Sequence, residues 1–600
     1  MTNLSRRGVL AAAAAAAAAP FVAGSSASAS PGSASANSQA QPKTWDLTLL
    51  GTSDTHGNVY NWDYYRDAEY DDNAHNDVGL AKVATLVNTI REQRKGKATL
   101  VLDAGDTIQG TPLATYYAKQ EPITATNEKH PMARAMNVIR YDAVTLGNHE
   151  FNYGLPLLDL WIRQLGFPAL AANAVNVKTG RPAFAPYVIK KVDLGQGAPN
   201  FRVGILGLTN PGIAIWDRDN VNGKLRFDDM VATAAKYVPE MRRRGADIVL
   251  ISAHGGDSGT SSYGPELPNE NPSALIAAQV PGIDAILFGH AHNDIPQRFV
   301  TNTATGAQVL LSEPSKWGQR VTRMDFTLTR ERGCWQITTK AATTINTNTV
   351  AADPVVLAAV REQHNKTVAY VNQVVANSTQ ELSAAESRYK DTAILDYINK
   401  VQTDTVAAAL AGGAYGSLPV LSIAAPFSRT ALFPAGQVKI KDVAGLYIYD
   451  NTLEAVVLTG AEVRAYLEYS AKYFVTLAPG APVNPATISD PAVPDYNYDT
   501  LSGVEYDIDI SRPVGQRITR LVHPGTTTPI GDAEQFVVAV NNYRRSGGGN
   551  FPGIVKTQVY NAQQEIRQLL IDWAQAKGAI DPADFYTPNW KLVREGVPVF

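Results

Sequence analysis

Short apolar runs of strand length alternate with amphipathic helical segments between about residue 45 and residue 345. Runs such as LTLL, FRVGILGLT, DIVLIS and DAILF are separated by segments such as PMARAMNVIR, LPLLDLWIRQLG and DMVATAAKYVPEMRRRGA. In GLAKVATLVNTIREQRK the apolar positions recur at helical spacing and form one stripe: Leu80, Val83, Leu86, Val87 and Ile90. This alternation predicts a largely parallel sheet with helices packed outside it.

Five of the strand-like runs end in Asp, His or Asn, in the contexts GTSDTH, LDAGD, LGNH, ISAH and FGHAH. In an open α/β sheet, ligands and chemistry gather where the strands end on their carboxyl side. The residues that this pattern brings to the strand ends are Asp54, His56, Asp106, Asn148, His149, His254, His290 and His292. This repetition is the strongest functional signal in the sequence.

The donor set is a mixture of imidazole and carboxylate without thiolate. Such a set suits Mn, Fe, Co or Zn better than Ca or Mg. Two such ions about 3.5–4 Å apart can activate water at neutral pH and clamp the oxygens of an in-line displacement. The arrangement needs a bridging carboxylate, and Asp106 is the candidate. The sequence therefore predicts phosphoester hydrolysis by two metal ions.

The pattern changes around residues 351–380. DPVVLAAVREQHNKTVAYVNQVV begins with an Asp-Pro cap and predicts one long amphipathic helix between domains. A second α/β region follows without further Asp or His strand ends, so the metal chemistry belongs to the first domain. We expect a leader at 1–43, a catalytic domain at 44–348, a connecting helix at 349–378 and a second domain at 379–600.

The leader has the features of a twin-arginine signal. Paired arginines in SRRGVL precede an alanine run from Ala11 to Ala19, and cleavage is expected near Ala27-Ser28-Ala29. The alternative is a membrane anchor, but the apolar run is too short to span a bilayer and its flanks are wrong. We therefore expect export and a secreted, periplasmic or cell-wall-associated protein without stable membrane insertion.

Composition narrows the classes of partner. Hydrophobic residues make up 45% and charged residues 18% of the 600 positions, which is ordinary for a soluble globular chain of several domains. The net charge of −3 gives no basic surface for a nucleic acid polymer or an anionic membrane. The single cysteine excludes an intrachain disulfide. We expect a monomer that acts on small molecules.

The motifs D-x-H, G-D, G-N-H-E, a lone H and G-H-x-H, in this order, resemble the calcineurin-like metallophosphoesterases. Downstream, NWDYYRD, GNHEFNYG, LPVLSIAAP, LYIYDNTL and AVNNYR resemble the 5'-nucleotidase superfamily, and within it the periplasmic 2',3'-cyclic-nucleotide 2'-phosphodiesterase/3'-nucleotidase enzymes. The likeness runs from about residue 46 to the C-terminus. It implies an N-terminal four-layer α/β sandwich of two sheets between helical layers, a connecting helix and a C-terminal α/β nucleotide-binding domain.

The resemblance assigns the ligands to two divalent ions. It implies one shell of Asp54, His56, Asp106 and His292, and another of Asp106, Asn148, His254 and His290. Any one of these residues alone would more simply be a satisfied polar residue at a loop start. The complete ordered set in its strand context is what favours metal binding. The other histidines lack this context and are assigned to surface or packing: His75, His130, His364 and His523.

His149 follows a ligand but need not bind metal, because adjacent residues of a strand point in different directions. In the resembling enzymes this histidine stabilises the transition state or protonates the leaving oxygen, which suits imidazole near neutral pH. Many of them orient it with an Asp three residues later, where this chain has Asn152. The amide can accept a hydrogen bond from the ring but supplies no charge, so the imidazolium should be less favoured.

The second domain contributes candidate substrate contacts. By resemblance, Tyr449 and Tyr543 are the aromatic pair that holds the nucleobase, and stacking would tolerate several bases. Without the motif context, core packing would be the default for either, since the chain has 26 tyrosines. Asn451 could contact the base edge, and Arg429 could meet substrate charge.

The resemblance thus implies an exported dinuclear enzyme that opens 2',3'-cyclic nucleotides and dephosphorylates 3'-nucleotides. One alternative is a 5'-nucleotidase or nucleotide-sugar hydrolase with the same metal centre, against which Asn152 and the tyrosine pair argue. Another, from a different class, is a secreted nucleotide-binding protein that has lost catalysis. The complete ligand set argues against that alternative.

Overall fold

The structure is a computed structural model that describes residues 43–95, 97–195, 197–263, 265–478 and 480–600. Residues 44–600 form one compact unit. Apart from Lys43, the predicted twin-arginine leader and its cleavage site lie outside the described residues. None of the helices in the described ranges combines the length and apolar character that crossing a bilayer requires.

The first of two six-stranded sheets has the order β14-β13-β1-β2-β3-β4. β1 to β4 pair in parallel, whereas β13 runs antiparallel to both β1 and β14. The strands span Trp45–Thr52 (β1), Ala98–Asp103 (β2), Ala143–Thr145 (β3), Ala169–Leu170 (β4), Arg320–Glu331 (β13) and Cys334–Asn346 (β14).

The second sheet has the order β11-β12-β10-β9-β7-β6. Its four inner strands are parallel, and the edge strands β6 and β11 are antiparallel to their neighbours. The strands span Tyr187–Val192 (β6), Phe201–Leu208 (β7), Ile248–Ala253 (β9), Ala285–Phe288 (β10), Asp294–Thr301 (β11) and Gln308–Pro314 (β12).

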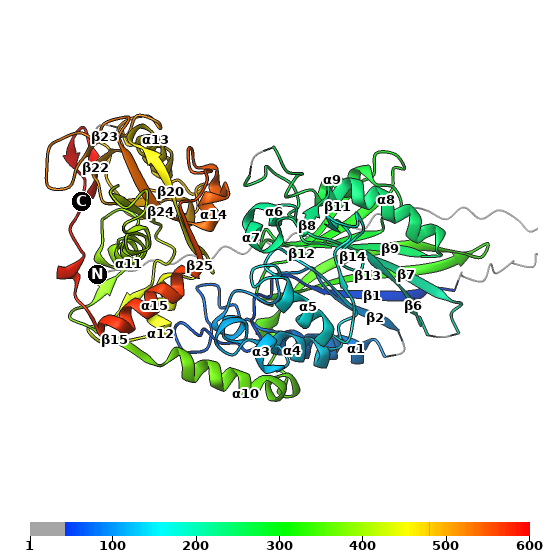
Figure 1. The fold of residues 1–600 in the computed structure, drawn as a ribbon. Helices are drawn as coiled ribbons and strands as arrows, with labels where there is room; N and C mark the ends of the chain where they lie inside the picture. Colours follow the sequence, from blue (N-terminus) through cyan, green and yellow to red (C-terminus); the bar gives the residue numbers. More distant parts are fainter. Residues whose placement is uncertain (1–42, 96, 196, 264, 479) are drawn as a thin grey trace, which may run out of the picture. The chain divides into compact units, whose positions relative to one another are not determined.

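The two sheets pack face to face between layers of helices. Buried side chains of both sheets form one apolar core, including Leu49, Leu100, Val203 and Leu250. Helices α1, α4 and α5 cover the outer face of the first sheet and α8 and α9 that of the second (Figure 1). These helices span Leu80–Gln93, Pro131–Ile139, Leu155–Gln164, Met230–Arg243 and Ser273–Gln279. The predicted four-layer α/β sandwich is confirmed.

Helix α1 shows why the pattern of apolar residues specifies these layers. All the positions of its predicted stripe are buried: Leu80, Val83, Leu86, Val87 and Ile90. Burying a large aliphatic side chain contributes about 1.5–3 kcal/mol, so this stripe holds the helix against the sheet. Three polar positions between them, Lys82, Thr85 and Asn88, are half-buried and donate hydrogen bonds to the segment that precedes α10 (Pro354–Val371).

Helix α10 (Pro354–Val371) lies within the range expected for the connecting helix. The Asp353 carboxylate caps it by accepting hydrogen bonds from the backbone amides of Val355 and Val356. Its buried face, with Val356 and Val360, joins the apolar core on the outer side of the first sheet. The helix is therefore fixed along its length.

The remaining chain builds a second mixed α/β region around a sheet of order β21-β17-β24-β20-β25. Helices α11 and α15 share a core with one face of this sheet, and α13 shares a core with the other. The strands are Thr500–Ser502, Val420–Ala424, Gln535–Asn541, Thr452–Thr459 and Tyr560–Glu565, and the helices Ala393–Leu410, Ile566–Lys577 and Gly460–Ser470. No group of His, Cys, Asp or Glu side chains in the described part of this region is arranged to hold a metal ion.

Candidate metal centre

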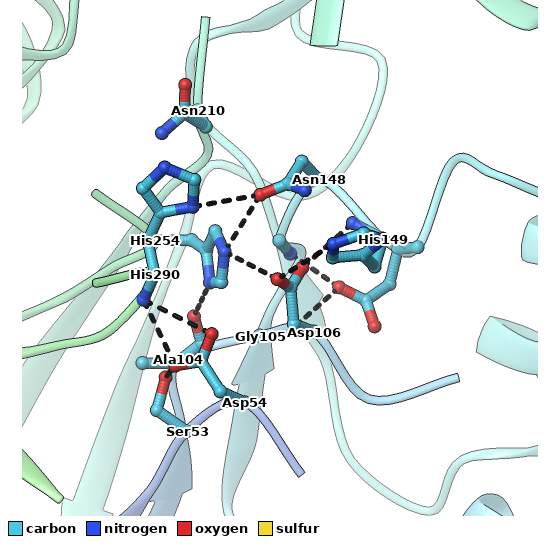
Figure 2. Close-up of polar contacts among 12 residues, drawn as sticks. Ser53, Asp54, Ala104, Gly105, Asp106, Asn148, His149, Asn210, His254 and His290 are labelled. Carbon is cyan, nitrogen blue, oxygen red and sulfur yellow. Dashed lines mark hydrogen bonds and ion pairs between the residues drawn. The ribbon is translucent and has the colours of Figure 1, made fainter. Parts of the chain in front are cut away.

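The predicted ligands meet where the parallel strands of both sheets end. Asp54 follows β1, Asp106 follows β2, and Asn148 follows β3 in the first sheet. In the second sheet, His254 follows β9, and the GHAH segment with His290 follows β10. Because the sheets pack face to face, their carboxyl ends bring these side chains together, as Figure 2 shows.

The possible metal ligands form three groups of three side chains. Within each group, the candidate ligand atoms all lie within 4.8 Å of one another. Asp106 belongs to two groups, with His254 and His290 in one and with His56 and His149 in the other. The third group is Asp54, His56 and His292, and it shares His56 with the second of these. Asn148 adjoins these groups through its contacts with His254 and His290. The residues that sequence analysis assigned to metal therefore lie together, and Asp106 and His56 each belong to two of the groups.

The His254 ring shows that this cluster suits a cation. Its Nδ1 lies 2.9 Å from the carbonyl oxygen of Ala104 and donates a proton to it. Its Nε2 faces Asp106 Oδ2 at 3.0 Å and Asn148 Oδ1 at 3.1 Å, and both oxygens are acceptors. Only a proton or a metal ion can lie favourably among these three atoms. Burial lowers the pKa of His254, but the charge of Asp106 and its contact with the ring outweigh burial, and the pKa rises to about 10.

His56 is held in the same way. Its Nδ1 is 3.0 Å from the carbonyl oxygen of Gln109, which fixes the proton on that nitrogen. Its Nε2 then presents a lone pair towards His292 Nε2, 3.2 Å away. Burial lowers the pKa of His56 to about 3, so the ring is neutral and available as a ligand.

His290 completes the pattern through a carboxylate that sequence analysis missed. Its Nε2 donates to Glu270 Oε1 at 2.8 Å, and its Nδ1 lies 3.1 Å from Asn148 Oδ1. A histidine oriented by a carboxylate in this way is a typical metal ligand. Glu270 lies in a long loop without periodicity, so no local signal in the sequence marks it. The donor chemistry fits the divalent ions that the sequence predicts.

Glu150 is a second residue without an assigned role in the sequence interpretation. Its carboxylate accepts hydrogen bonds from the backbone amides of Asp106 at 2.9 Å, Thr107 at 2.5 Å and Gly147 at 2.6 Å. It therefore ties the loop after β2 to the loop after β3 and fixes Asp106. The GNHE motif contains this glutamate, so its position in the motif was the available signal.

The backbone at the cluster is held in an unusual conformation. Several candidate ligands have positive φ angles, a region that costs a residue with a Cβ about 1–2 kcal/mol. They are Asp54 (51°), His56 (47°), Asp106 (59°), His290 (83°) and His292 (61°). Cross-loop hydrogen bonds such as Asp54 N to Gly105 O at 2.8 Å hold this backbone in place. The ligand atoms are thus pre-organised by the fold.

His149 points differently from Asn148, as predicted for adjacent residues. Its backbone amide donates to Asp106 Oδ1 at 2.8 Å, and its ring Nδ1 lies 2.6 Å from Asn152 Oδ1. Burial lowers the pKa of His149, but Asp106, the bond to Asn152 and the charge of Asp217 raise it above its ordinary value overall. Asn152 supplies no negative charge to the ring, but Asp217 partly replaces the charge that an aspartate at position 152 would supply. Sequence analysis did not identify Asp217.

A cavity of about 1370 Å³ opens at the cluster. His149 and His292 line it, and so do three tyrosines, Tyr449, Tyr496 and Tyr543. The structure therefore brings both proposed base-binding tyrosines to the cavity that contains the candidate ligands. It also adds Tyr496, whose ring centroid is 6.2 Å from that of Tyr449 in an edge-on contact. No motif marked Tyr496, which lies in the short 3-10 turn Asp495–Asn497.

The other two candidate substrate contacts, Asn451 and Arg429, differ in their surroundings. Asn451 lines the cavity, and its Nδ2 donates to the Tyr447 hydroxyl at 3.3 Å. Arg429 is exposed, and its Nη2 donates to Asp495 Oδ1 at 2.8 Å. Its neighbour Ser428 lines the cavity, while the guanidinium of Arg429 is engaged by the carboxylate.

The histidines that sequence analysis left out of the site lie outside the cluster. His130 is fully buried at the start of α4, where its Nδ1 accepts from the Met132 amide at 3.2 Å. His364 stacks on Tyr60 with ring centroids 4.0 Å apart. His75 is exposed beside Asp71. These are packing and surface positions, as predicted.

Comparisons with known proteins agree with this geometry. The family model of the calcineurin-like phosphoesterases matches residues 47–294, and that of the 5'-nucleotidase C-terminal domain matches residues 371–556. The chain is 33% identical to the 2',3'-cyclic-nucleotide 2'-phosphodiesterase/3'-nucleotidase of Haemophilus influenzae, over 91% of this chain and 87% of that protein. It is equally 33% identical to the trifunctional nucleotide phosphoesterase protein YfkN of Bacillus subtilis, of whose greater length it spans 39%.

Solved structures support the fold. A putative 5'-nucleotidase from Staphylococcus aureus superposes with a TM-score of 0.73 at 24% identity, covering 91% of this chain and 99% of that one. A 5'-nucleotidase precursor from Thermus thermophilus superposes with a TM-score of 0.62 at 22% identity, covering 92% and 99%. Fold and site together define a metal-dependent phosphoric ester hydrolase of the nucleotidase class. The chain belongs to the family of the 2',3'-cyclic-nucleotide 2'-phosphodiesterase/3'-nucleotidases, which joins a calcineurin-like phosphoesterase domain to a 5'-nucleotidase C-terminal domain.

Proposed function

We propose that this enzyme opens 2',3'-cyclic nucleotides and then dephosphorylates the resulting 3'-nucleotides. In the first step water adds to phosphorus, the bond to the 2' oxygen breaks, and that oxygen leaves with a proton. In the second step water adds again, the bond to the 3' oxygen breaks, and nucleoside and phosphate are released. The names of relatives at about one-third identity over most of the chain favour these substrates.

Two divalent ions are proposed to bind at the cluster, one in each predicted shell with Asp106 shared. Mn, Zn, Co or Fe fit the imidazole and carboxylate donors. When bound, such ions activate water and neutralise charge on the phosphate. The chain itself contributes the fixed direction of each lone pair, because His56, His254 and His290 each bind an acceptor through their other ring nitrogen.

His149 is proposed to give a proton to the leaving oxygen. Its Nδ1 is occupied by Asn152, so the nitrogen available to the substrate is Nε2. The side chain is 33% exposed and lines the cavity, which gives it access to a bound phosphate ester. General acid catalysis of this kind contributes about 10²–10⁴-fold.

The nucleobase is proposed to stack between Tyr449 and Tyr543, with Asn451 at its edge. Arg429 is the proposed contact for substrate charge, at the rim and balanced by Asp495. Gripping a base remote from the phosphate fixes the reacting bond relative to the ligands and converts binding energy into rate. Stacking makes few demands on the identity of the base, so several bases should be accepted.

The observation that carries the proposal is the cavity shared by the candidate ligand cluster and the tyrosines. The deciding experiment compares kcat/KM for 2',3'-cyclic AMP, 3'-AMP and 5'-AMP with the purified, metal-loaded enzyme. We expect the first two to be hydrolysed much faster than 5'-AMP. Asp106→Ala, which removes the shared carboxylate, serves as the inactive control.

Other outcomes have definite meanings. Preference for 5'-AMP or a nucleotide sugar would identify the enzyme as a 5'-nucleotidase or nucleotide-sugar hydrolase with the same centre. If the protein binds nucleotides but hydrolyses none of them and holds no transition metal, it is a nucleotide-binding protein that has lost catalysis.

Export by the twin-arginine route is proposed from the leader alone, with a monomeric mature protein in the periplasm, at the cell wall or secreted. Replacing Arg6 and Arg7 with lysine should retain the precursor in the cytoplasm. Fractionation of cells that express either form tests the route, and light scattering of the mature form tests its oligomeric state.

A further inference from the structure

The side chain of Asn152 has a second partner on the side away from His149. Its Nδ2 donates to Asp217 Oδ1 at 2.8 Å, while its Oδ1 lies 2.6 Å from His149 Nδ1. Asp217 is only 6% exposed, and it joins the short helices Ile213–Trp216 and Arg218–Val221. His149 and Asn152 from one loop and Asp217 from a turn 65 residues later therefore form one continuous chain of hydrogen bonds.

The turn that carries Asp217 is fastened to the loop that carries Asn152. Asn220 Nδ2 donates to the carbonyl oxygens of Phe151 at 2.9 Å and Asn152 at 3.0 Å. The Asn220 amide in turn donates to the Asp217 carbonyl oxygen at 2.9 Å. The Asp217 carboxylate is thus held at a fixed position behind the amide by backbone contacts on both sides.

This contact decides which way the amide of Asn152 faces. An asparagine amide can present either its oxygen or its nitrogen, and here the Asp217 oxygen Oδ1 accepts from the nitrogen, Nδ2 of Asn152. Asp217 therefore selects the nitrogen, and the oxygen must face His149. An amide oxygen accepts, so His149 Nδ1 must carry the proton, and Nε2 is left to face the cavity.

We propose that Asp217 is a positioning residue that acts through Asn152 to set the tautomer and orientation of His149. In this arrangement the carboxylate orients the ring through the amide of Asn152, whereas a carboxylate at position 152 would bind the ring directly. The inference rests on the proposed function of His149 as proton donor to the leaving oxygen. Asp217 borders the cavity, and its carboxylate reaches the His149 ring through the hydrogen bond from Asn152.

The environment of Asp217 is consistent with this role. Burial raises its pKa, the Asn152 bond and His149 lower it, and the result is a pKa of about 7. Its second oxygen, Oδ2, is buried without a hydrogen-bond partner in the described part of the chain. A carboxylate kept this dry serves no evident purpose in packing, since an apolar side chain would cost less.

The first test uses substrates with different leaving groups. Expelling the nucleoside alcohol of 3'-AMP requires a proton, whereas p-nitrophenolate leaves readily without one. Asp217→Ala should therefore lower kcat for 3'-AMP about 10–100-fold, a part of the general-acid contribution, but lower that for p-nitrophenyl phosphate only about threefold or less. KM for 3'-AMP should change little. Asp217→Asn, whose amide oxygen can still accept from Asn152, should retain more activity than Asp217→Ala.

The second test exchanges the positions of the amide and the carboxylate between residues 152 and 217. Asn152→Asp alone places two carboxylates against each other and should impair turnover of 3'-AMP. Combining Asn152→Asp with Asp217→Asn restores one carboxylate and one amide in reversed order, and should be more active than the single Asn152→Asp variant. Asp228→Asn, at an exposed carboxylate paired with Arg226, is the matched control and should behave as wild type.

Thermal melting and bound metal are measured for every variant, so that a failure to fold is recognised. Equal losses on both leaving groups in Asp217→Ala, or no loss on either, would overturn the proposal. So would a double variant no better than Asn152→Asp. If instead the wild-type enzyme does not hydrolyse 3'-AMP, it is the proposed function that fails, and the two failures are distinguishable.

Discussion

Asp396 is a buried carboxylic acid in α11 of the C-terminal region, remote in sequence from the metal cluster. Burial and, to a smaller extent, the neighbouring Asp391 raise its pKa to about 8. The folded protein thus holds this proton more tightly than the unfolded chain, whose aspartate has a pKa of about 3.9. Its contribution to stability is full below pH 4 and is lost as the pH rises towards 8.

Asp396→Asn should remove this dependence, because asparagine has nearly the same shape and no charge. We expect the variant and wild type to have similar free energies of unfolding near pH 4. The variant should become more stable by roughly 1–3 kcal/mol as the pH approaches 8. Urea unfolding at several pH values measures this. A constant difference across the range would show that Asp396 is ionised in the fold.

The sequence brought the candidate ligand residues into view because each lies at the end of an apolar strand-like run and belongs to an ordered motif. It could not predict Glu270 or Asp217, which lie in loops and acquire their partners only by tertiary contact. Glu270 meets His290 across 20 positions, and Asp217 meets Asn152 across 65. Neither spacing corresponds to a helical or strand repeat, so no local pattern distinguishes these carboxylates from solvated ones.

At the scale of elements, the loops after β2 and β3 approach so closely that one of them requires glycine. A Cβ on Gly147 would lie 2.2 Å from Asp106 Oδ1 and 2.5 Å from Asp106 N, with His254 Nδ1 at 2.8 Å. These contacts are shorter than any that a real side chain tolerates, so the backbone or Asp106 would have to move.

Gly147→Ala should therefore displace Asp106, lower the affinity for metal and reduce turnover at least 100-fold, since a misplacement of about 1 Å can cost that much. Metal content by mass spectrometry and kcat for a chromogenic phosphodiester are the measurements. Gly531→Ala is the control, because the nearest atom to its added Cβ is 3.9 Å away. Normal metal content in Gly147→Ala would contradict the proposed rigidity of this contact.

Element prediction succeeded where one face of an element is apolar. The stripe of α1 and the Asp-Pro start of α10 both occur where the pattern placed them. The C-terminal sheet was predicted only as α/β, since its strands order themselves β21-β17-β24-β20-β25 through pairings far apart in sequence. Such pairing depends on tertiary packing of each face, which a linear pattern does not contain.

For the molecule as a whole, the metal cluster should also contribute to stability. Asp54 and Asp106 are almost completely buried, and both lie in groups that contain His56. A cation that binds only the folded state stabilises it by RT ln(1 + [L]/Kd), about 2.7 kcal/mol at a hundredfold excess over Kd. Chelation with EDTA should lower Tm by a few degrees, and re-addition of the native metal should restore both Tm and turnover.

Scanning fluorimetry with Mn, Zn, Co and Fe added back separately would identify the ion that restores both properties. Asp106→Ala provides the control, because its Tm should respond much less to EDTA. An equal response in the variant would show that the ion acts elsewhere in the protein.

The cavity couples the cluster to the tyrosines, so substrate size should determine the effect of losing them. Replacing Tyr449 and Tyr543 with alanine should raise KM for 3'-AMP by about tenfold or more, because stacking contributes about 1–3 kcal/mol per base. The KM for p-nitrophenyl phosphate, which has no nucleobase, should change far less. Steady-state kinetics on both substrates tests this, and equal effects would refute the stacking role.

The left-handed backbone at the five ligand positions has a consequence for laboratory evolution. A library selected only to survive heating, with no demand for turnover, should accumulate glycine or asparagine at those five codons, since either residue relaxes the backbone. Such survivors would melt later than the parent and cleave nothing. Heat tolerance and chemistry thus compete for the same few positions, and a thermostable working enzyme has to gain its margin elsewhere in the chain.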